Sequence, residues 1–355
     1  MTTKYLPTPA LILDKAAFED NRRAMATLLA GSTLSLRPHF KSHKCAAIAK
    51  MQIADGAVGM TCAKLSEAED LVYAGVEDIL IANQITDPEK IMRLAYLARA
   101  AHITVCVDNA ANVRALSRAC TFAGSHLSVL VEYDLGMARC GVTKYSEVLS
   151  LAVFVNGAEM TGLSYAGIQA YAGHISHVVS EEERCAMTAE KERDLRALIA
   201  YLDNMGFAPK IISGGSTGTA AIKAKAGLYT ELQAGSYLFM DATYRDLALP
   251  FKNSLYVLTS VISVNGDTAI VDAGVKSVGV DQGMPVPLGF TAERVVASEE
   301  HFQIHNPSKH LRVGDRVLLI PGHCCSTVNL HNEIYLTEED KIVDRIPVTS
   351  RGGFR

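Results

Sequence analysis

The sequence lacks several features that would assign it to other classes of protein. No apolar run approaches the roughly 20 residues of a membrane-spanning helix, and the first residues lack the apolar segment and cleavage site of a secretory signal. The net charge is −4, without a long run of either sign, which argues against nucleic acid and membrane as partners. The eight cysteines are scattered without the spacing of a disulfide framework. We therefore expect a cytoplasmic protein with reduced thiols.

Strand-like and helix-like stretches alternate along the first two thirds of the chain. Helical patterns such as 87–101, 110–123 and 181–204 separate apolar or β-branched runs. These runs lie near 34–36, 59–62, 78–82, 103–107, 128–133, 165–170, 210–213 and 231–239. Eight strands in this order predict an α/β fold with a (β/α)8 barrel, preceded by a helix over 15–30.

The pattern changes after about residue 247. Strand-like stretches at 255–264, 268–272 and 316–320 follow, with turn residues and little helix. We therefore predict a barrel over 15–246 and a C-terminal β domain over 247–355. The short strand within 1–14 has no place among the eight barrel strands, so we expect it to join the β domain.

A cationic turn follows the first predicted barrel strand, where residues 37–44 read Arg-Pro-His-Phe-Lys-Ser-His-Lys. Catalytic groups of such barrels lie at the carboxyl ends of the strands. Neighbouring positive charge and partial burial favour the neutral amine of Lys41, the form that attacks a carbonyl carbon. His39 and His43 are candidates for proton transfer beside it. A solvated surface turn is the alternative that these residues leave open.

A loop rich in glycine and hydroxyl groups follows the seventh strand and opens a helix. It consists of Ser213, Gly214, Gly215, Ser216, Thr217, Gly218 and Thr219. Glycine lets backbone N–H groups approach an anion, and a helix N-terminus favours negative charge. Strand eight then ends in Gly235, Ser236 and Tyr237, and the loops after strands seven and eight are the usual phosphate site of this fold. Because nucleotide-binding fingerprints are missing, we expect a ligand with one phosphate; a plain turn with a helix cap is the alternative.

An amine after strand one and a phosphate site after strand seven face the same barrel mouth, as pyridoxal phosphate requires. With these motifs and those at 132–142, 272–274 and 321–323, nearly the whole chain resembles the fold-type III pyridoxal-phosphate enzymes of the D-threonine aldolase and D-serine dehydratase group. The resemblance implies an alanine-racemase-like barrel and a homodimer. It makes Lys41 the Schiff-base lysine and assigns the phosphate to the loop 213–219 and Tyr237. It places Arg139, Gln169 and Tyr171 around the cofactor ring.

His323 and Cys325 lie two residues apart in the predicted β domain. On an extended segment both side chains point the same way and could share one metal ion. A buried thiol pair, Cys324 and Cys325, beside a hydrogen-bonded histidine is the alternative. The resembling family places a catalytic metal on this His and the residue two later, usually Asp in the aldolase branch and Cys in the dehydratase branch. A thiolate ligand favours zinc over manganese or magnesium.

The other motifs, at 169–174, 213–219 and 233–237, fit the aldolase branch better. The resemblance therefore favours a pyridoxal-phosphate- and metal-dependent lyase that cleaves a D-3-hydroxy amino acid to glycine and an aldehyde. The main alternative is a zinc-dependent D-serine or D-3-hydroxyaspartate dehydratase, which gives a 2-oxo acid and ammonia. An amino-acid racemase and a non-catalytic pyridoxal-phosphate carrier are further alternatives. Family positions also assign substrate contacts to Asp281 and Glu299, where a turn and a solvated charge cluster are the plainer interpretations.

Overall fold

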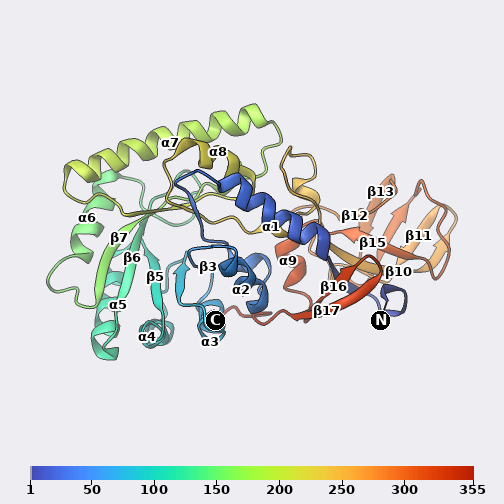
Figure 1. Cartoon of the computed structure of the whole chain (residues 1–355), viewed down its shortest axis with the longest axis horizontal. Helices are drawn as coiled ribbons and strands as arrows, with labels where there is room; N and C mark the ends of the chain where they lie inside the picture. The colour runs from blue at the N-terminus through green and yellow to red at the C-terminus, as the bar shows by residue number, and fades with distance from the viewer. Residues whose placement is uncertain (1) are drawn as a thin grey trace. The chain divides into compact units, whose positions relative to one another are not determined.

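The computed structural model describes residues 2–355 (Figure 1). The chain divides into two compact units. Unit 1 comprises residues up to Met25, Ser42–Ala47 and Ser236–Gly352. Unit 2 comprises Ala26–Lys41, Ile48–Gly235 and Gly353–Arg355. Over residues 2–355, none of the helices combines the length and the apolar character needed to cross a lipid bilayer.

Unit 2 is built on eight parallel strands, which confirms the predicted barrel. Their order in the sheet is β2-β9-β8-β7-β6-β5-β4-β3. The two ends of this order are linked just after β2, where His39 bridges Thr61 and the N–H of Thr61 donates to the Pro38 carbonyl at 2.8 Å. The strands are β2 (Ser35–Leu36), β3 (Met60–Cys62), β4 (Asp78–Ile81), β5 (His102–Val107), β6 (Leu127–Glu132), β7 (Leu163–Gln169), β8 (Ile211–Gly214) and β9 (Glu231–Leu232).

Helices connect these strands and lie outside the sheet (Figure 1). They are α3 (Leu65–Tyr73), α4 (Pro88–Leu97), α5 (Ala110–Ala123), α6 (Tyr145–Val155), α7 (Glu181–Asn204) and α8 (Ala220–Ala226), whereas α1 (Lys15–Leu29) and α2 (Ala46–Ala54) continue from unit 1 into unit 2. All six residues of β6 are buried, as expected for a parallel strand covered on both faces. The strand ends, with the loops that follow them, are therefore the places where polar side chains can meet a ligand.

The eighth strand is shorter than predicted. The sequence pattern predicted a strand over 231–239, but β9 ends at Leu232 and a 3-10 helix covers Ser236–Leu238. The apolar run 237–240 is buried in unit 1. A short apolar run indicates that a segment is buried but does not distinguish a strand from other structure, which explains the wrong boundary. The backbone just after β9 still pairs irregularly, since the N–H of Gln233 donates to the Gly214 carbonyl at 2.9 Å.

Unit 1 is a β domain that includes the N-terminal strand. Strand β1 (Ala10–Asp14) pairs antiparallel with β10 (Leu255–Asn265) and parallel with β16 (Glu333–Glu338). The remaining strands are β11 (Thr268–Val271), β12 (Val286–Pro287), β13 (Arg294–Ala297), β14 (Phe302–His305), β15 (Arg316–Ile320) and β17 (Lys341–Pro347). Ala10, Ile12 and Leu258 belong to one buried cluster, so strand β1 contributes to the core of this domain.

Candidate active site

A cavity of about 170 Å³ lies at the carboxyl ends of the barrel strands in unit 2. It is lined by His39, Lys41, Ala63, Ala82, Asn83, Arg139, Cys140, Gln169, Tyr171 and Gln233. The structure thus brings together His39, Lys41, Arg139, Gln169 and Tyr171, which come from loops far apart in the sequence. Asn83, Cys140 and Gln233 also line the cavity, although no role was predicted for them. Each follows a barrel strand, so position at a strand end was the signal that could have identified them.

The expected partial burial of Lys41 is wrong, because Lys41 is an exposed residue on a 3-10 turn over Phe40–Ser42. The fully buried Phe40 anchors this turn. The backbone N–H of Lys41 donates to Nδ1 of His39 at 3.4 Å. A neutral His39 ring therefore carries its proton on Nε2. His43 belongs to unit 1, where it is fully buried and its Nδ1 accepts from the N–H of Cys45 at 3.2 Å.

The expected crowding of positive charge around Lys41 is wrong for Arg37. This residue is 4% exposed and forms ion pairs with Asp78 at 2.6 Å and with Glu231 at 2.7 Å. Asp78 and Glu231 begin β4 and β9, so both carboxylates lie at the amino ends of their strands, away from the cavity. A buried guanidinium needs such partners, and their charges compensate that of Arg37.

Arg139 is carried by a loop after β6 that one carboxylate organises. Oδ1 of Asp134 accepts from the N–H groups of Gly136 at 2.9 Å and Met137 at 2.7 Å, and Oδ2 accepts from that of Ala138 at 3.0 Å. The guanidinium carbon of Arg139 lies 5.8 Å from the ring centroid of Tyr171, within the range of a cation–π contact. Asp134 therefore helps to place Arg139 beside Tyr171 at the cavity.

The predicted phosphate loop is a compact buried turn that begins in the last two residues of β8. The N–H of Ser216 donates to Oγ1 of Thr219 at 3.1 Å, which caps the 3-10 helix Thr217–Thr219 ahead of α8. Gly215 has φ +78°, and a Cβ at Gly218 would lie 1.9 Å from the Ser176 carbonyl oxygen, so both positions require glycine. The residues of this loop are Ser213, Gly214, Gly215, Ser216, Thr217, Gly218 and Thr219, all of them buried.

The boundary between the units falls within the second predicted phosphate segment, 235–237. Gly235 ends a segment of unit 2, whereas Ser236 and Tyr237 belong to unit 1. Oγ of Ser236 lies 3.9 Å from Sγ of Cys325. Tyr237 is 2% exposed, and the centroid of its ring lies 5.7 Å from that of Phe251.

His323 and Cys325 do not lie on an extended segment, and that prediction is wrong. His323 is the N-cap of a short helix, α9 (Cys324–Val328). The small residues Cys-Cys-Ser-Thr follow it. The last of them, Thr327, donates from Oγ1 to the His323 carbonyl at 2.7 Å. Such side chain to backbone bonds favour a turn or helix start over a strand. The alternation of strand side chains therefore does not apply to this pair.

The side chains of His323 and Cys325 nevertheless interact within unit 1. Burial lowers the pKa of His323, but hydrogen bonds to Cys325 and Asp281 and their charges outweigh it and raise that pKa to about 9. Nδ1 of His323 lies 2.7 Å from Oδ2 of Asp281, and Oδ1 of Asp281 accepts from Ser326 Oγ at 2.5 Å. Within residues 2–355 there is no group of three or more His, Cys, Asp or Glu side chains placed to hold a metal ion.

Glu299 lies on the surface of unit 1. Its side chain is 77% exposed and pairs with Nζ of Lys276 at 2.8 Å.

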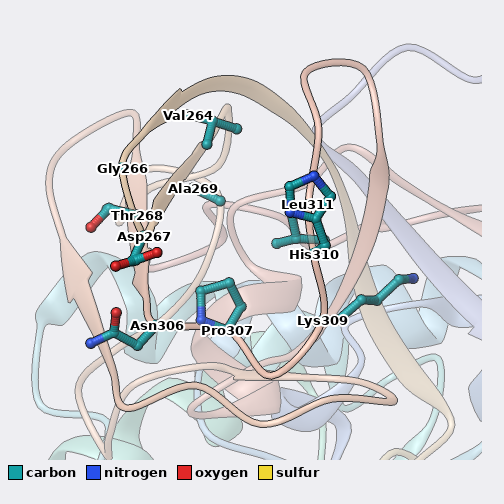
Figure 2. A pocket seen from close by; sticks show the side chains of 10 residues that line it. All are labelled: Val264, Gly266, Asp267, Thr268, Ala269, Asn306, Pro307, Lys309, His310 and Leu311. Atoms are coloured by element: carbon teal, nitrogen blue, oxygen red, sulfur yellow. The ribbon is translucent and has the colours of Figure 1, made fainter.

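A separate pocket of about 220 Å³ in this unit lies beside the β10–β11 turn and the loop after β14 (Figure 2). Its lining consists of Val264, Gly266, Asp267, Thr268, Ala269, Asn306, Pro307, Lys309, His310 and Leu311, and it includes none of the predicted site residues.

The side chains at the unit 2 cavity suit an anionic aromatic cofactor. The lining supplies an amine, a guanidinium, an imidazole, a phenol and three amides, and the described lining residues include no carboxylate. A hydrogen bond links the cavity to the loop 213–219, because Nε2 of the lining residue Gln233 donates to Oγ of Ser213 at 2.9 Å. Pyridoxal phosphate, which combines a carbonyl, a phenolate and a phosphate, matches this set of cations and donors.

Comparison with known proteins gives a consistent result along the chain. Residues 13–243 match the family "Alanine racemase, N-terminal domain", and residues 254–337 match the family "Putative serine dehydratase domain". A D-threonine aldolase from Arthrobacter sp. is 40% identical over 97% of this chain and 93% of its own length. A 3-hydroxy-D-aspartate aldolase from Paracoccus denitrificans is 37% identical over 99% of this chain and 94% of its own length.

Solved structures and a more distant relative extend this result. The crystal structure of D-threonine aldolase from Filomicrobium marinum matches with a TM-score of 0.94 and 38% identity, over 100% of this chain and 98% of that one. A D-threo-3-hydroxyaspartate dehydratase from Delftia sp. is 29% identical over 92% of this chain and 93% of its own length. The chain therefore belongs to the alanine-racemase-like, fold-type III family of pyridoxal-phosphate enzymes, in the group of D-threonine aldolases and D-serine dehydratases.

Proposed function

We propose that this chain is a pyridoxal-phosphate-dependent lyase that cleaves a D-3-hydroxy amino acid between Cα and Cβ to give glycine and an aldehyde. The observation that carries the proposal is the cavity that places Lys41 beside Arg139, Gln169 and Tyr171. The choice of C–C cleavage over dehydration rests on the identities of 40% and 37% with aldolases, against 29% with a dehydratase.

The barrel unit holds the cofactor in this proposal. When bound, pyridoxal phosphate supplies a carbonyl for the amino group of the substrate and a ring that takes up the electrons of the broken bond. Lys41 would hold the cofactor covalently, Arg139, Gln169 and Tyr171 would contact its ring, and the loop 213–219 with Gly235 would hold its phosphate. The enzyme acts as a homodimer, as the family resemblance implies.

His39 is the proton carrier that the cavity offers. Cleavage requires the 3-hydroxyl of the substrate to lose a proton, and glycine forms when a proton is added at Cα. His39 lines the cavity. For Nε2 to take the hydroxyl proton and deliver it to Cα, the ring must alternate between the neutral form with its proton on Nδ1 and the imidazolium, so the long bond from the Lys41 N–H to Nδ1, at 3.4 Å, opens during turnover. His43 is the second candidate, and matched asparagine substitutions separate the two.

A divalent ion bound by His323 and Cys325 completes the proposal. Zinc is preferred over manganese or magnesium because a thiolate is a soft ligand. Such an ion would supply Lewis acidity toward the substrate hydroxyl. Asp281 supports this assignment, because its contact with Nδ1 of His323 at 2.7 Å is the carboxylate–histidine pairing that orients ligating histidines.

Product analysis tests the proposed function. Purified protein is incubated with pyridoxal phosphate, with or without zinc or manganese, and with D-threonine, D-serine or isomers of 3-hydroxyaspartate. We expect glycine and an aldehyde, identified by mass, and neither product from Lys41→Ala. Ammonia and a 2-oxo acid would identify a dehydratase, and racemisation that survives removal of divalent ions would identify a racemase. Absence of turnover with every substrate of the panel would favour a non-catalytic carrier of pyridoxal phosphate.

A further inference from the structure

A chain of hydrogen-bonded polar side chains, all buried except the half-buried Gln84, crosses the barrel strands next to the cavity. Nε2 of Gln84 donates to Oε2 of Glu132 at 2.5 Å, and Glu132 also hydrogen-bonds to Gln169. Nε2 of Gln233 then donates to Oε1 of Gln169 at 3.0 Å and to Oγ of Ser213 at 2.9 Å. We call these five residues the Glu132 chain. Gln169 and Gln233 line the cavity, and Ser213 begins the phosphate loop.

The orientation of every amide in the Glu132 chain follows from one acceptor. A carboxylate accepts hydrogen bonds and donates none, so the amide groups that Gln84 and Gln169 turn toward Glu132 are their NH2 groups. Oε1 of Gln169 consequently faces Gln233 and accepts from its Nε2. Ser213 also accepts from that Nε2, so its own hydroxyl proton is directed elsewhere. Glu132 thereby fixes which polar atoms Gln169 and Gln233 present to the cavity.

Glu132 also contacts the loop that carries Arg139. The N–H of Val142 donates to the Glu132 carbonyl at 2.9 Å. Gly141, with φ +99°, returns the loop so closely that a Cβ there would lie 3.1 Å from Cγ of Glu132. The side chain of Glu132 is consequently buried, with the residue 5% exposed. Glu132 therefore meets the amides through its carboxylate and the Arg139 loop through its backbone carbonyl and Cγ.

The carboxylate of Glu132 is buried and is satisfied by amide hydrogen bonds. Burial raises the pKa of Glu132, while hydrogen bonds from Gln84 and Gln169 and the charge of Arg139 oppose this rise. An isolated buried carboxyl is costly unless its lone pairs are satisfied. Its presence here, with two amides committed to it, needs a reason beyond stability, because an apolar side chain of similar volume would avoid that cost.

We propose that Glu132 is a positioning residue that fixes the amide orientation of Gln169 and Gln233 and holds the Arg139 loop in the form that binds the cofactor. The identity of that cofactor rests on the proposed function, whereas the hydrogen-bonded chain does not. The role is indirect, since Glu132 acts through Gln169, Gln233 and Arg139. No role of this kind follows for another buried glutamate, Glu231, which pairs with Arg37 at the amino ends of the strands.

Glu132→Gln tests this role with almost no change in volume. The new amide presents one oxygen to two NH2 groups, so either Gln84 or Gln169 loses its acceptor or turns over. A turned Gln169 would place its NH2 against that of Gln233. We expect the dissociation constant for pyridoxal phosphate, measured by titration of the apoprotein, to rise at least tenfold, with an altered absorbance spectrum of the bound form. Glu231→Gln removes a comparable buried carboxylate from the opposite end of the strands and serves as the matched control.

A double substitution should restore cofactor affinity if Glu132 acts by orienting the amides, and should not restore it if Glu132 only stabilises the fold. In Glu132→Gln with Gln84→Glu, the carboxylate moves to position 84 and accepts from the NH2 group at position 132. The oxygen at position 132 then faces Gln169 as in the original chain. We expect this swap to restore most of the cofactor affinity. If the single variant fails to fold, the double variant still tests the role of Glu132.

Three outcomes would overturn the role of Glu132. They are wild-type cofactor affinity in Glu132→Gln, an equal loss in Glu231→Gln, and a double variant no better than the single one. Failure of the proposed function is seen separately, because a wild-type protein that binds the cofactor but cleaves no substrate still reports on Glu132 through affinity and absorbance.

Discussion

The backbone N–H of Lys41 donates to Nδ1 of His39 at 3.4 Å, and the N–H of Cys45 donates to Nδ1 of His43 at 3.2 Å in the same i to i+2 geometry. The first of these bonds places the amine and the imidazole of the proposed mechanism on one turn at the cavity. The second holds a histidine that is fully buried in unit 1. Two histidines with equivalent local bonds thus occupy different surroundings.

This equivalence allows the two histidines to be compared directly. Asparagine can accept the same backbone N–H through its Oδ1, so His39→Asn and His43→Asn both retain the local bond while removing the titrating ring. We expect His39→Asn to lower kcat about 10²-fold, in the range of a lost proton-transfer group, with KM little changed. His43→Asn should retain kcat within a few fold. A larger kcat loss in His43→Asn would reverse the assignment.

Asp134 gives a prediction about the loop that carries Arg139. Asp134→Ala removes an acceptor for three backbone N–H groups, so the loop should loosen and cofactor affinity should fall, with a loss of roughly 1 kcal/mol in the free energy of unfolding. Asp87→Ala is the control, because Asp87 caps α4 by accepting from the N–H of Lys90 at 3.0 Å. We expect a comparable stability loss in Asp87→Ala without a change in cofactor binding. Equal effects of both variants on binding would contradict a specific role for the loop.

The barrel was predictable because its signals are local and repeated. Fully buried parallel strands such as β6 require continuous apolar runs, and the glycine-rich segment 213–219 can be identified by composition alone. The strand-end rule then brings Lys41 and Gln169 to one cavity without knowledge of the packing. The hydrogen bond from Gln233 to Ser213, which joins that cavity to the loop, depends on tertiary structure and has no sequence signal.

Other features depend on partners far apart in the chain and were mispredicted or missed. Arg37 looked like part of a cationic cluster, but its partners Asp78 and Glu231 are separated from it by 41 and 194 residues. The segment after His323 looked extended, but hydroxyl-to-backbone bonds start α9 there. Glu132 lies in an apolar strand, and only the structure shows its contacts with Gln84 and Gln169.

The metal assignment predicts different behaviour for two adjacent cysteines. Cys325 interacts with His323, whereas Cys324 is fully buried and its N–H donates to Asp241 at 2.9 Å. We expect Cys325→Ala to lower the zinc content measured by mass spectrometry to near background and to reduce activity, and Cys324→Ala to retain both. Treatment with a chelator should inactivate wild-type protein, and added zinc should restore activity. Full zinc occupancy in Cys325→Ala would rule out this ligand.

Lys223 lies beneath the phosphate loop and gives a prediction about stability and pH. The residue is 4% exposed, its Nζ lies 3.6 Å from the ring centroid of Tyr229 and 3.6 Å from Oε1 of Glu192, and a Cβ at Gly215 would lie 2.7 Å from its Cδ. Burial lowers the pKa of Lys223 from 10.5 to about 8, although Glu192 opposes this shift. The loop therefore rests on a lysine that gives up its proton more readily than usual.

The sign of the pH effect follows from that lowered pKa. Below about pH 8 the amine is charged in both the folded and the unfolded states. Between about pH 8 and 10.5 the folded state releases the proton first, so the unfolded state binds more protons and the contribution of Lys223 to stability rises with pH. The free energy of unfolding of wild type minus that of Lys223→Met should therefore rise from pH 8 to pH 10, by at most about 1.4 kcal/mol per pH unit. Urea titrations at pH 7.5, 9 and 10 measure this difference, with the exposed Lys225→Met as control. A difference that stays flat or falls over this range would show that Lys223 is not a buried cation in the folded protein.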